Sequence, residues 1–307
     1  MGTMVWDTIY RWGGGEPVEE WGGVAYALAA FEATLPPDWV IVPLIKVGRD
    51  LAPQANAFFQ RLTHRAGAAR LIEVPEPNNR ITLRYVTEVR RTEALRGGVP
   101  GWTWEELGPM VRDVDALYVN FIAGHEVDLA TAGALRRGFT GPIYADLHSL
   151  FLQLAPDGRL VPCGLPDAGS WFECFDVAQL NDEEMDRLGG PPMEVAARAL
   201  AAGVRLLIVT VGPRGTVYFT SPPFGFGPRR GAPGPVRTAR IPAPAVPEAG
   251  DPTGCGDVLG ATLFSRLLAG DDLEAALAEA NRLAARNVSA RGATDLHFHL
   301  RGELLPR

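Results

Sequence analysis

Short apolar runs alternate with stretches of helical periodicity along most of this chain, and this alternation constrains the fold more than any other feature. The apolar runs are rich in aliphatic residues and bounded by Gly, Pro or polar residues, as strands buried on both faces are. They lie at residues 40–44, 116–120, 143–146, 177–180 and 206–211. Helical periodicity occupies residues 23–33, 51–65, 104–112, 128–137, 193–202, 256–268 and 273–290. The pattern predicts an α/β fold with a central, mainly parallel sheet and helices on both faces.

Two segments depart from this alternation. Residues 80–92 alternate apolar and polar side chains, as a sheet exposed on one face does, so we expect a flap outside the main sheet. Residues 221–247 are rich in Pro and Gly and are expected to form loops and edge strands. No internal repeat or clean linker divides the 307 residues. We therefore expect a single domain with a small β lid formed by about residues 8–21 and 80–97.

Composition narrows the class of partner. The net charge of −7 argues against a nucleic-acid or anionic-membrane partner, and no apolar run reaches the roughly 18 residues that a membrane span needs. The N-terminus lacks the features of a signal peptide, so a cytoplasmic location is the default expectation. The 3 cysteines show no C-x-x-C spacing, which favours reduced thiols and argues against a zinc site.

Lysine is almost absent, and this limits how the chain can hold a phosphate. Lys46 is the only lysine, and its surroundings, L-I-K-V-G-R, do not form the G-K-[ST] of a Walker-type phosphate loop. Any phosphate site must therefore be built from backbone N–H groups, arginine or a metal ion.

Residues 251–257 read D-P-T-G-C-G-D and open a helical stretch. Glycines at such a turn allow positive φ and a close approach of the backbone to a ligand. The N–H groups of Gly254, Cys255 and Gly256 would then face an anion at a helix N-terminus, where the helix dipole adds positive charge. Asp257 lies in that first turn and is expected to be ionised and ready to accept a proton. Taken alone, the same residues also fit a glycine turn with a dipole-complementing Asp.

The whole motif resembles the D-T-x-G-A-G-D signature of the ribokinase/PfkB family of sugar and nucleoside kinases. The resemblance implies a ribokinase-like fold, an anion hole at Gly254, Cys255 and Gly256, and Asp257 as the base that takes the proton of the acceptor hydroxyl. Pro252 replaces the usual Thr and Cys255 the usual Ala, both mild changes for a site built from backbone N–H groups. A reactive thiol at Cys255 is the less favoured interpretation.

Further motifs resemble the nucleotide side of the same family. Asn181 and Glu184 match the N-x-x-E motif, which implies that Glu184 organises Mg²⁺ through water; by itself this spacing is also that of a helix capping box. Thr210, Gly212 and Gly215 match T-x-G-x-x-G at a strand end, although alone this is only a turn. Asn281 lies in the stretch that resembles the helix beside the adenine pocket.

The acceptor side matches less closely. Asp7 completes an early G-x-x-x-x-D, whose Asp binds sugar hydroxyls in the family; a strand should precede Gly2, so the first strand is expected to be shortened or the recorded start to be too late. Gly22 and Gly23 resemble the G-G motif, but Ala27 stands where the family usually has Asn, which puts ribose in doubt.

Other polar residues follow predicted strand ends. Asn120, Asp146 and His148 lie where α/β sheets bind ligands. Asp146 is the strongest substrate-binding candidate among them, with a capping or turn role as the equal alternative.

Several other residues have simpler interpretations. We interpret Arg84 on the flap as a surface arginine rather than a ligand contact, and His297 and His299 as structural, because a metal pair would lack a third ligand. Trp102 and Trp104 are interpreted as packing residues rather than sugar platforms.

The resemblance implies ATP-dependent transfer of a phosphoryl group to a hydroxyl of a sugar, polyol or nucleoside, with ATP and Mg²⁺ as cofactors. It leaves open a monovalent cation such as K⁺ and a homodimer formed through the lid. A second hypothesis is a non-catalytic family member that binds a carbohydrate or nucleotide as a sensor. A Rossmann dehydrogenase is disfavoured, because no G-x-G-x-x-G occurs early in the chain.

Overall fold

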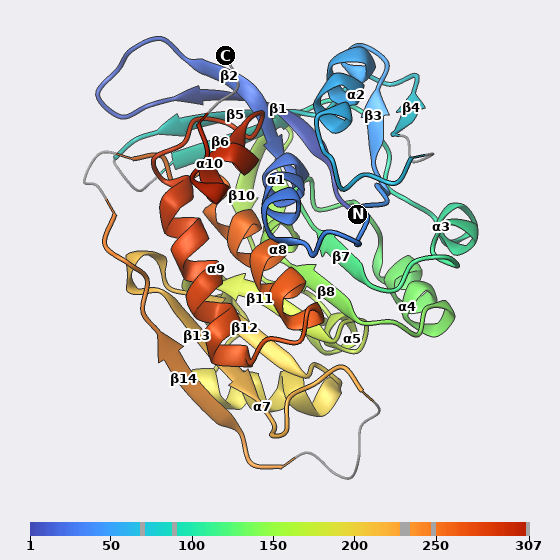
Figure 1. Cartoon of the computed structure of the whole chain (residues 1–307), viewed down its shortest axis with the longest axis vertical. Helices are drawn as coiled ribbons and strands as arrows, with labels where there is room; N and C mark the ends of the chain where they lie inside the picture. The colour runs from blue at the N-terminus through green and yellow to red at the C-terminus, as the bar shows by residue number, and fades with distance from the viewer. Residues whose placement is uncertain (68–70, 88–90, 228–233, 247–249, 305–307) are drawn as a thin grey trace.

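The computed structural model describes residues 1–67, 71–87, 91–227, 234–246 and 250–304. Its main sheet has the strand order β14-β13-β12-β11-β8-β7 (Figure 1). The strands are β7 (Leu117–Asn120), β8 (Ile143–Asp146), β11 (Val177–Asn181), β12 (Leu206–Thr210), β13 (Thr216–Thr220) and β14 (Arg237–Ile241). β7, β8, β11 and β12 run parallel, while β13 and β14 are antiparallel to their neighbours. The predicted parallel core and the predicted edge strand are therefore both present.

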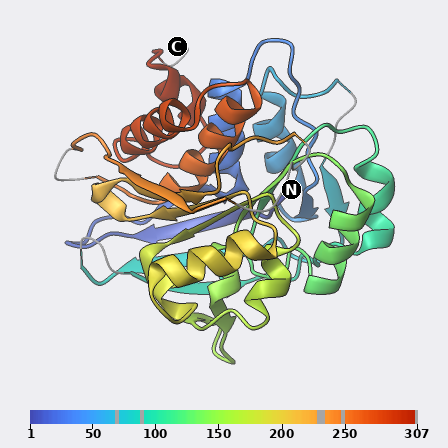
Figure 2. The ribbon, with the colours of Figure 1, turned by 90° about the horizontal axis from the view of Figure 1, so that it is seen from below.

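Helices cover both faces of this sheet, as the buried strands require (Figure 2). One face carries α1 (Val24–Thr34), α8 (Cys255–Leu268), α9 (Leu273–Asn287) and α10 (Leu296–Arg301). The other face carries α3 (Trp104–Met110), α4 (Leu129–Gly138), α5 (Ala168–Phe172), α6 (Asp182–Arg187) and α7 (Pro192–Ala202). β12 shows why both faces need helices. Leu206 and Ile208 pack against the helices of the first face, and Leu207 and Val209 pack against those of the other face. No side of this strand faces water, so its sequence is continuously apolar.

A second six-stranded sheet forms the lid, with the order β2-β1-β5-β6-β10-β9. Its strands are β1 (Met4–Tyr10), β2 (Val18–Gly23), β5 (Arg80–Tyr85), β6 (Arg91–Arg96), β9 (Leu152–Leu154) and β10 (Arg159–Pro162). The segments at residues 8–21 and 80–97, which we expected to form a lid, contribute to β1, β2, β5 and β6 of this sheet, and residues 88–90 lie outside the described residues. The sequence did not predict the β9–β10 hairpin, which extends the lid beyond β6.

The predicted strand at residues 40–44 is wrong. Ile41 makes only an isolated bridge with Arg65, and Val40 and Val42 are exposed. The strand of this region is β3 (Lys46–Gly48), which pairs with β4 (Ile72–Val74) in a separate sheet, and α2 (Ala52–Gln60) lies between them. Residues 40–44 line a cavity beside β7 without forming a ladder with it, so this apolar run stays outside the main sheet.

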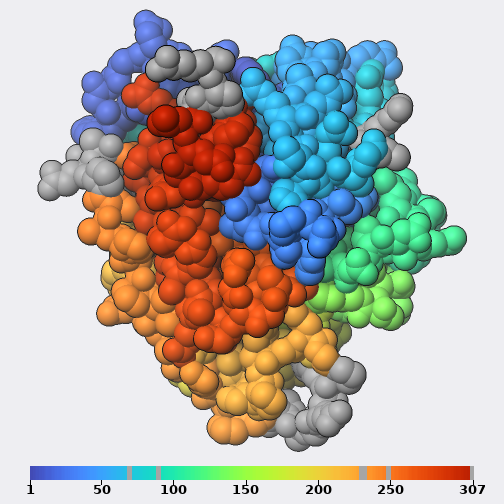
Figure 3. Space-filling model, viewed as in Figure 1, coloured from blue at the N-terminus to red at the C-terminus, as the bar shows by residue number. Residues whose placement is uncertain are grey.

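The first residues and the last helix tie the two ends of the chain to this framework. Gly2 forms a parallel bridge with Asn120, and Met1 is hydrogen-bonded to the backbone of Tyr118 and Asn120, so the first residues lie along β7 before the chain continues into the second sheet as β1. On the face shown in Figure 3, α10 lies beside the region that contains α2, and Arg61 pairs with Asp295 at 2.7 Å across them. Within the described residues, no helix has both the length and the apolarity to span a bilayer.

Candidate active site

The loop before α8 is held in a fixed turn. The Cys255 N–H donates to the Pro252 carbonyl at 3.1 Å, and the Thr253 N–H donates to Asp251 Oδ1 at 3.0 Å. Gly254 has φ 78°, and a Cβ at this position would collide with the ring of Tyr26 on α1. The loop therefore needs glycine here both for its backbone angle and for its packing.

Only part of the predicted anion hole is free to bind. The N–H groups of Gly254 and Gly256 have no partner among the described residues, and they lie at the N-terminus of the 14-residue helix α8. The Cys255 N–H is already bonded to Pro252, which differs from the expectation that all three donors face the anion. Two backbone donors and the helix dipole thus remain for an anion.

Asp257 lies in the first turn of α8 and contacts the end of β7. Its Oδ1 accepts a 2.6 Å hydrogen bond from Asn120 Nδ2. Burial raises the pKa of Asp257 to about 6, although Asn120, His148 and Arg91 act in the opposite direction. Burial therefore outweighs the helix terminus on which the sequence-based expectation relied. At neutral pH the carboxylate is still mostly ionised and able to accept a proton.

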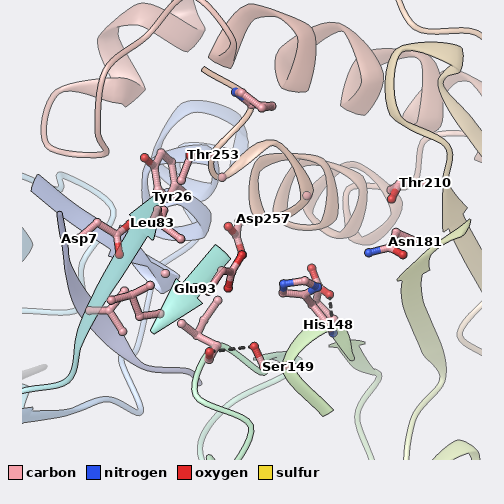
Figure 4. A pocket seen from close by; sticks show the side chains of 18 of the residues that line it. Asp7, Tyr26, Leu83, Glu93, His148, Ser149, Asn181, Thr210, Thr253 and Asp257 are labelled. Carbon is pink, nitrogen blue, oxygen red and sulfur yellow. Dashed lines mark hydrogen bonds between the residues drawn. The ribbon is translucent and has the colours of Figure 1, made fainter. Parts of the chain in front are cut away.

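A cavity of about 230 Å³ lies in front of Asp257 and gathers most of the predicted site residues (Figure 4). The predicted residues that line it are Asp7, Gly23, Asp146, Asn181, Glu184, Thr210, Gly254, Gly256 and Asp257. In Figure 4, Asp7 and Tyr26 lie on one side of Asp257, and His148, Asn181 and Thr210 lie on the other. Gly22 does not line the cavity, but a Cβ there would collide with the Asp7 carboxylate. Gly22 therefore makes room for Asp7 rather than contacting a ligand.

Two more carboxyl groups line the cavity without a basic partner. Asp7 is 3% exposed, and its Oδ1 has no hydrogen-bond partner among the residues that the structure describes. Burial raises the pKa of Asp7 well above its usual value. Asp146 accepts hydrogen bonds from Gln179 Nε2 at 2.7 Å and from the His148 N–H at 3.2 Å. Burial, assisted by Asp257, raises the pKa of Asp146 to about 8.

Both carboxylate oxygens of Glu184 are hydrogen-bonded to neighbouring residues. Asn181 caps α6 in a complete capping box, in which the Asn181 N–H donates to Glu184 Oε2 at 2.8 Å. Glu184 Oε1 meets His148 Nδ1 at 2.6 Å and Asn181 Nδ2 at 2.6 Å. Burial lowers the pKa of His148, but Glu184 and nearby carboxylates outweigh this and raise the pKa to about 10. The capping-box interpretation of N-x-x-E is therefore correct in structural terms, and His148 is a cation that the sequence did not identify.

The lid contributes a second cation, Arg91, which like His148 is only partly buried. Arg91 donates from Nε to Glu93 Oε1 at 2.7 Å and from Nη1 to the Tyr85 hydroxyl at 3.1 Å. The Tyr85 hydroxyl lies 3.1 Å from Thr253 Oγ1, so the lid contacts the loop of α8. The antiparallel register places Arg91 and Glu93 opposite Tyr85 and Leu83, on the face that covers the cavity. A polar pair on an otherwise apolar face is the feature of the sequence that could have identified Arg91 and Glu93 as site residues.

A larger cavity of about 750 Å³ adjoins the first at Thr210, Pro252 and Gly256. Its apolar wall is formed by residues of α8, α9 and the segment after β14, namely Leu259, Ala284, Ala285, Val288, Ala243, Pro244 and Val246. The predicted Gly212 and Gly215 line it as well. Asn281 lines it too, but its amide is engaged by Thr216 Oγ1 at 2.7 Å and the Ile241 carbonyl at 3.0 Å. Asn281 thus joins α9 to β13 and β14.

The other residues that the sequence analysis considered as ligand or metal contacts have structural roles. Arg84 is exposed and stacks on Tyr10 at 3.7 Å, as expected of a surface arginine. Trp102 is buried in the core. His297 is buried and His299 Nε2 lies 3.0 Å from the Arg286 carbonyl, both on α10.

The surroundings of Cys255 disfavour its thiolate form. Burial raises the pKa of its thiol to about 11, and Sγ contacts the Ala284 carbonyl. The thiol is therefore protonated at neutral pH, which removes the nucleophilic form.

Comparisons with known proteins agree with this architecture. Residues 156–298 match the model of the pfkB family carbohydrate kinase. The ribokinase from Thermotoga maritima is similar in structure, with a TM-score of 0.70 and 18% identity over 96% of its chain and 98% of this one. The Arabidopsis thaliana ribokinase complexed with ribose and ATP gives 0.66 and 17% identity, covering 97% of its chain and 98% of this one.

A pyrophosphate-dependent kinase in the ribokinase family, complexed with a pyrophosphate analog and myo-inositol, gives a TM-score of 0.73 and 16% identity over 96% of each chain. The comparison with curated protein sequences gave no match. TM-scores between 0.66 and 0.73 establish a shared fold.

Proposed function

We propose that this chain transfers a phosphoryl group from ATP to a hydroxyl of a sugar, polyol or nucleoside. The ribokinase-like fold supports this, as does the match of residues 156–298 to the model of the pfkB family carbohydrate kinase. One observation carries the proposal. Asp257, a half-buried carboxylate with a pKa of about 6, lies on the same helical turn as the N–H groups of Gly254 and Gly256, which have no partner in the part of the chain that the structure describes. This arrangement supports a proton acceptor beside an anion site, close to Gly256, which lines both cavities.

In the proposed reaction, the side chains and backbone groups of the site have separate roles. The acceptor hydroxyl loses its proton to Asp257 as its oxygen forms a bond to the γ-phosphorus. The bond between that phosphorus and the β–γ bridging oxygen breaks, and ADP leaves. The N–H groups of Gly254 and Gly256 stabilise the charge on the transferring group. The lid contact between Tyr85 and Thr253 keeps water from the site, where it would otherwise compete with the acceptor.

Magnesium ions neutralise phosphate charge in reactions of this class. The residues present do not form a direct site for such an ion. Both oxygens of Glu184 are engaged by Asn181 and His148, and among the described residues no group of three or more His, Cys, Asp or Glu side chains is placed to hold a metal. An ion that enters with the donor would therefore be held by phosphate oxygens and water, and Glu184 would orient it through water.

The second cavity favours a nucleotide as donor. Its volume of about 750 Å³ lies well within the range of sites for drug-sized ligands. Apolar residues such as Leu259, Ala284 and Val288 form a wall against which a base can pack. Pyrophosphate lacks any group that needs this wall, so ATP is the better fit.

A donor and acceptor panel tests the proposal. ATP and pyrophosphate are each incubated with the protein, Mg²⁺ and a set of monosaccharides, cyclitols and nucleosides, and the phosphate ester is detected by mass spectrometry. The proposal predicts an ester that forms with ATP and depends on the acceptor. Binding of ATP and of a carbohydrate without any ester would instead support the non-catalytic sensor.

A further inference from the structure

Two cations face the cavity in front of Asp257, and the reaction described above assigns them no role. Arg91 and His148 are the only basic side chains among the described residues that line this cavity. They come from different parts of the fold, because Arg91 lies on β6 of the lid and His148 opens the 3-10 helix that follows β8. Within this part of the chain, a protein cation that meets a substrate here is therefore one of these two.

The ring of His148 is held at one nitrogen and open at the other. Nδ1 lies 2.6 Å from Glu184 Oε1, and the His148 backbone N–H donates to Asp146 Oδ1 at 3.2 Å. Nε2 has no hydrogen-bond partner among the residues that the structure describes, and the side chain is 39% exposed. Because the pKa of His148 is raised to about 10, Nε2 carries a proton at neutral pH and can donate a hydrogen bond to an anion.

Arg91 is arranged in the same way. Its Nε donates to Glu93 Oε1 at 2.7 Å, and its Nη1 donates to the Tyr85 hydroxyl at 3.1 Å. Nη2 has no partner in the described ranges of the chain, and the side chain is 27% exposed. Nη1 also lies 3.5 Å from Thr253 Oγ1, which places the guanidinium beside the loop that carries the backbone anion site. Each cation thus keeps a free N–H group after its ion pair is formed.

Both free donors lie on the route of the transferring group. In Figure 4, His148 lies on the side of Asp257 toward Asn181 and Thr210, and Thr210 also lines the donor cavity. Arg91 lies on the face of the lid that covers the smaller cavity. A phosphoryl group that moves from the donor cavity to a hydroxyl at Asp257 therefore passes these two side chains.

The negative charge of that group requires partners that carry full charges. Phosphoryl transfer depends on neutralising the oxygens of the transferring group, and the two backbone N–H groups at the start of α8 supply only partial charges. Glu184, which the resemblance assigns to organising Mg²⁺ through water, instead has a protein cation at 2.6 Å. Cations that their own ion pairs already orient need little reorganisation when the charge develops. Arg91 and His148 meet both requirements.

We propose that His148 Nε2 and Arg91 Nη2 bind the γ-phosphoryl group of the donor and neutralise its charge during transfer. Both are then catalytic residues, and their ion pairs with Glu184 and Glu93 orient them for this role. The proposal rests on the proposed function, because it names the groups that hold the phosphoryl group of that reaction. It also gives the lid a chemical part, since one of the two cations belongs to it.

Calorimetry tests the contact with the γ-phosphate separately from catalysis. The non-hydrolysable ATP analogue AMP-PNP is compared with ADP in the presence of EDTA, so that no metal ion contributes. The ratio of AMP-PNP affinity to ADP affinity should fall about tenfold in His148→Asn and in Arg91→Gln. His125→Asn and Arg84→Gln change exposed residues of the same types outside the cavity and should leave the ratio unchanged. An unchanged ratio in either site variant, with circular dichroism and melting temperature like the wild type, would overturn the proposal.

A second substitution of His148 separates the phosphate contact from the structural contact. The amide of Asn lies near the position of Nδ1 and can keep the bond to Glu184, whereas the amide of Gln reaches the position of Nε2. His148→Gln should therefore keep more of the affinity ratio than His148→Asn. The opposite order would show that the bond to Glu184 controls binding, and would contradict a direct contact with the donor.

Steady-state kinetics test the catalytic part of the proposal. His148→Asn should lower kcat about tenfold to a hundredfold, while KM for the acceptor changes little. A raised acceptor KM with an unchanged kcat would place His148 on the acceptor and overturn the assignment. If the wild type binds AMP-PNP more tightly than ADP through these residues but transfers nothing to any acceptor, the proposed function fails and the γ-phosphate site stands.

Discussion

The side-chain amide of Asn120 donates a 2.6 Å hydrogen bond to Oδ1 of Asp257. The bond joins the end of β7 to the first turn of α8, two elements far apart in the sequence. It stabilises the ionised carboxylate and lowers the pKa of Asp257 against the larger effect of burial, which leaves that pKa at about 6. A residue of the sheet therefore sets the protonation of the proposed base.

This contact predicts the acid limb of the pH profile. In the wild type, kcat/KM should fall as the pH decreases through about 6, because protonated Asp257 cannot accept the hydroxyl proton. Asn120→Ala removes the hydrogen bond, so the limb should move to higher pH. Steady-state rates between pH 5 and 9 measure the shift. A limb that stays in place in the variant would show that another group controls it.

Glycine at position 254 should be essential to the loop. Gly254→Ala forces a methyl group into the Tyr26 ring at φ 78°, so we expect a loss of stability of about 1–3 kcal/mol and a large fall in activity. Gly256→Ala is the matched control for stability, because its Cβ would lie 3.6 Å from Gln179, an ordinary contact. Urea unfolding of the two variants compares them, and equal stabilities would refute the strain argument.

Cys255 should be dispensable as a nucleophile. Its thiol pKa of about 11 keeps it protonated at pH 8, so iodoacetamide should label the partly exposed Cys163 well before Cys255. Peptide mapping by mass spectrometry locates the label. Cys255→Ala should keep transfer within a few-fold of the wild type, and a loss of about a thousandfold would restore a chemical role for the thiol.

Asp146 should make stability depend on pH. Its pKa rises from 3.8 to about 8 in the folded state, so between these values the folded chain keeps a proton that the unfolded chain releases. The contribution of Asp146 to the free energy of unfolding therefore decreases as the pH rises across this window. In Asp146→Asn this decrease should be absent. Parallel pH dependences of unfolding in the two proteins would contradict the raised pKa.

The core of the fold was predictable because its strands are buried on both faces. For β8 the predicted and observed bounds coincide, and for β12 they differ by one residue at the C-terminal end. A strand that is buried on both faces is continuously apolar, so its own residues are enough to identify it. Residues 40–44 have the same local composition and failed, because strand formation there depends on a partner elsewhere in the chain.

The site was predictable where one segment carries the chemistry. Residues 251–257 supply the loop, the helix terminus and Asp257 together, so a local motif sufficed. His148, Arg91 and Glu93 were missed or undervalued because their roles arise from contacts between distant segments. Asn281 shows the opposite error: its position at the cavity was correct, but bonds to Thr216 and Ile241 engage its amide.

Asp257→Asn tests the central claim most directly. The substitution keeps the shape of the side chain and removes its negative charge and its ability to accept the proton. We predict that transfer from ATP falls by about 10²–10⁴-fold, while calorimetric binding of a non-hydrolysable ATP analogue remains within a few-fold of the wild type. Asp186→Asn, at an exposed position of α6, is the control and should retain full activity. Transfer at the wild-type rate in Asp257→Asn would contradict the account.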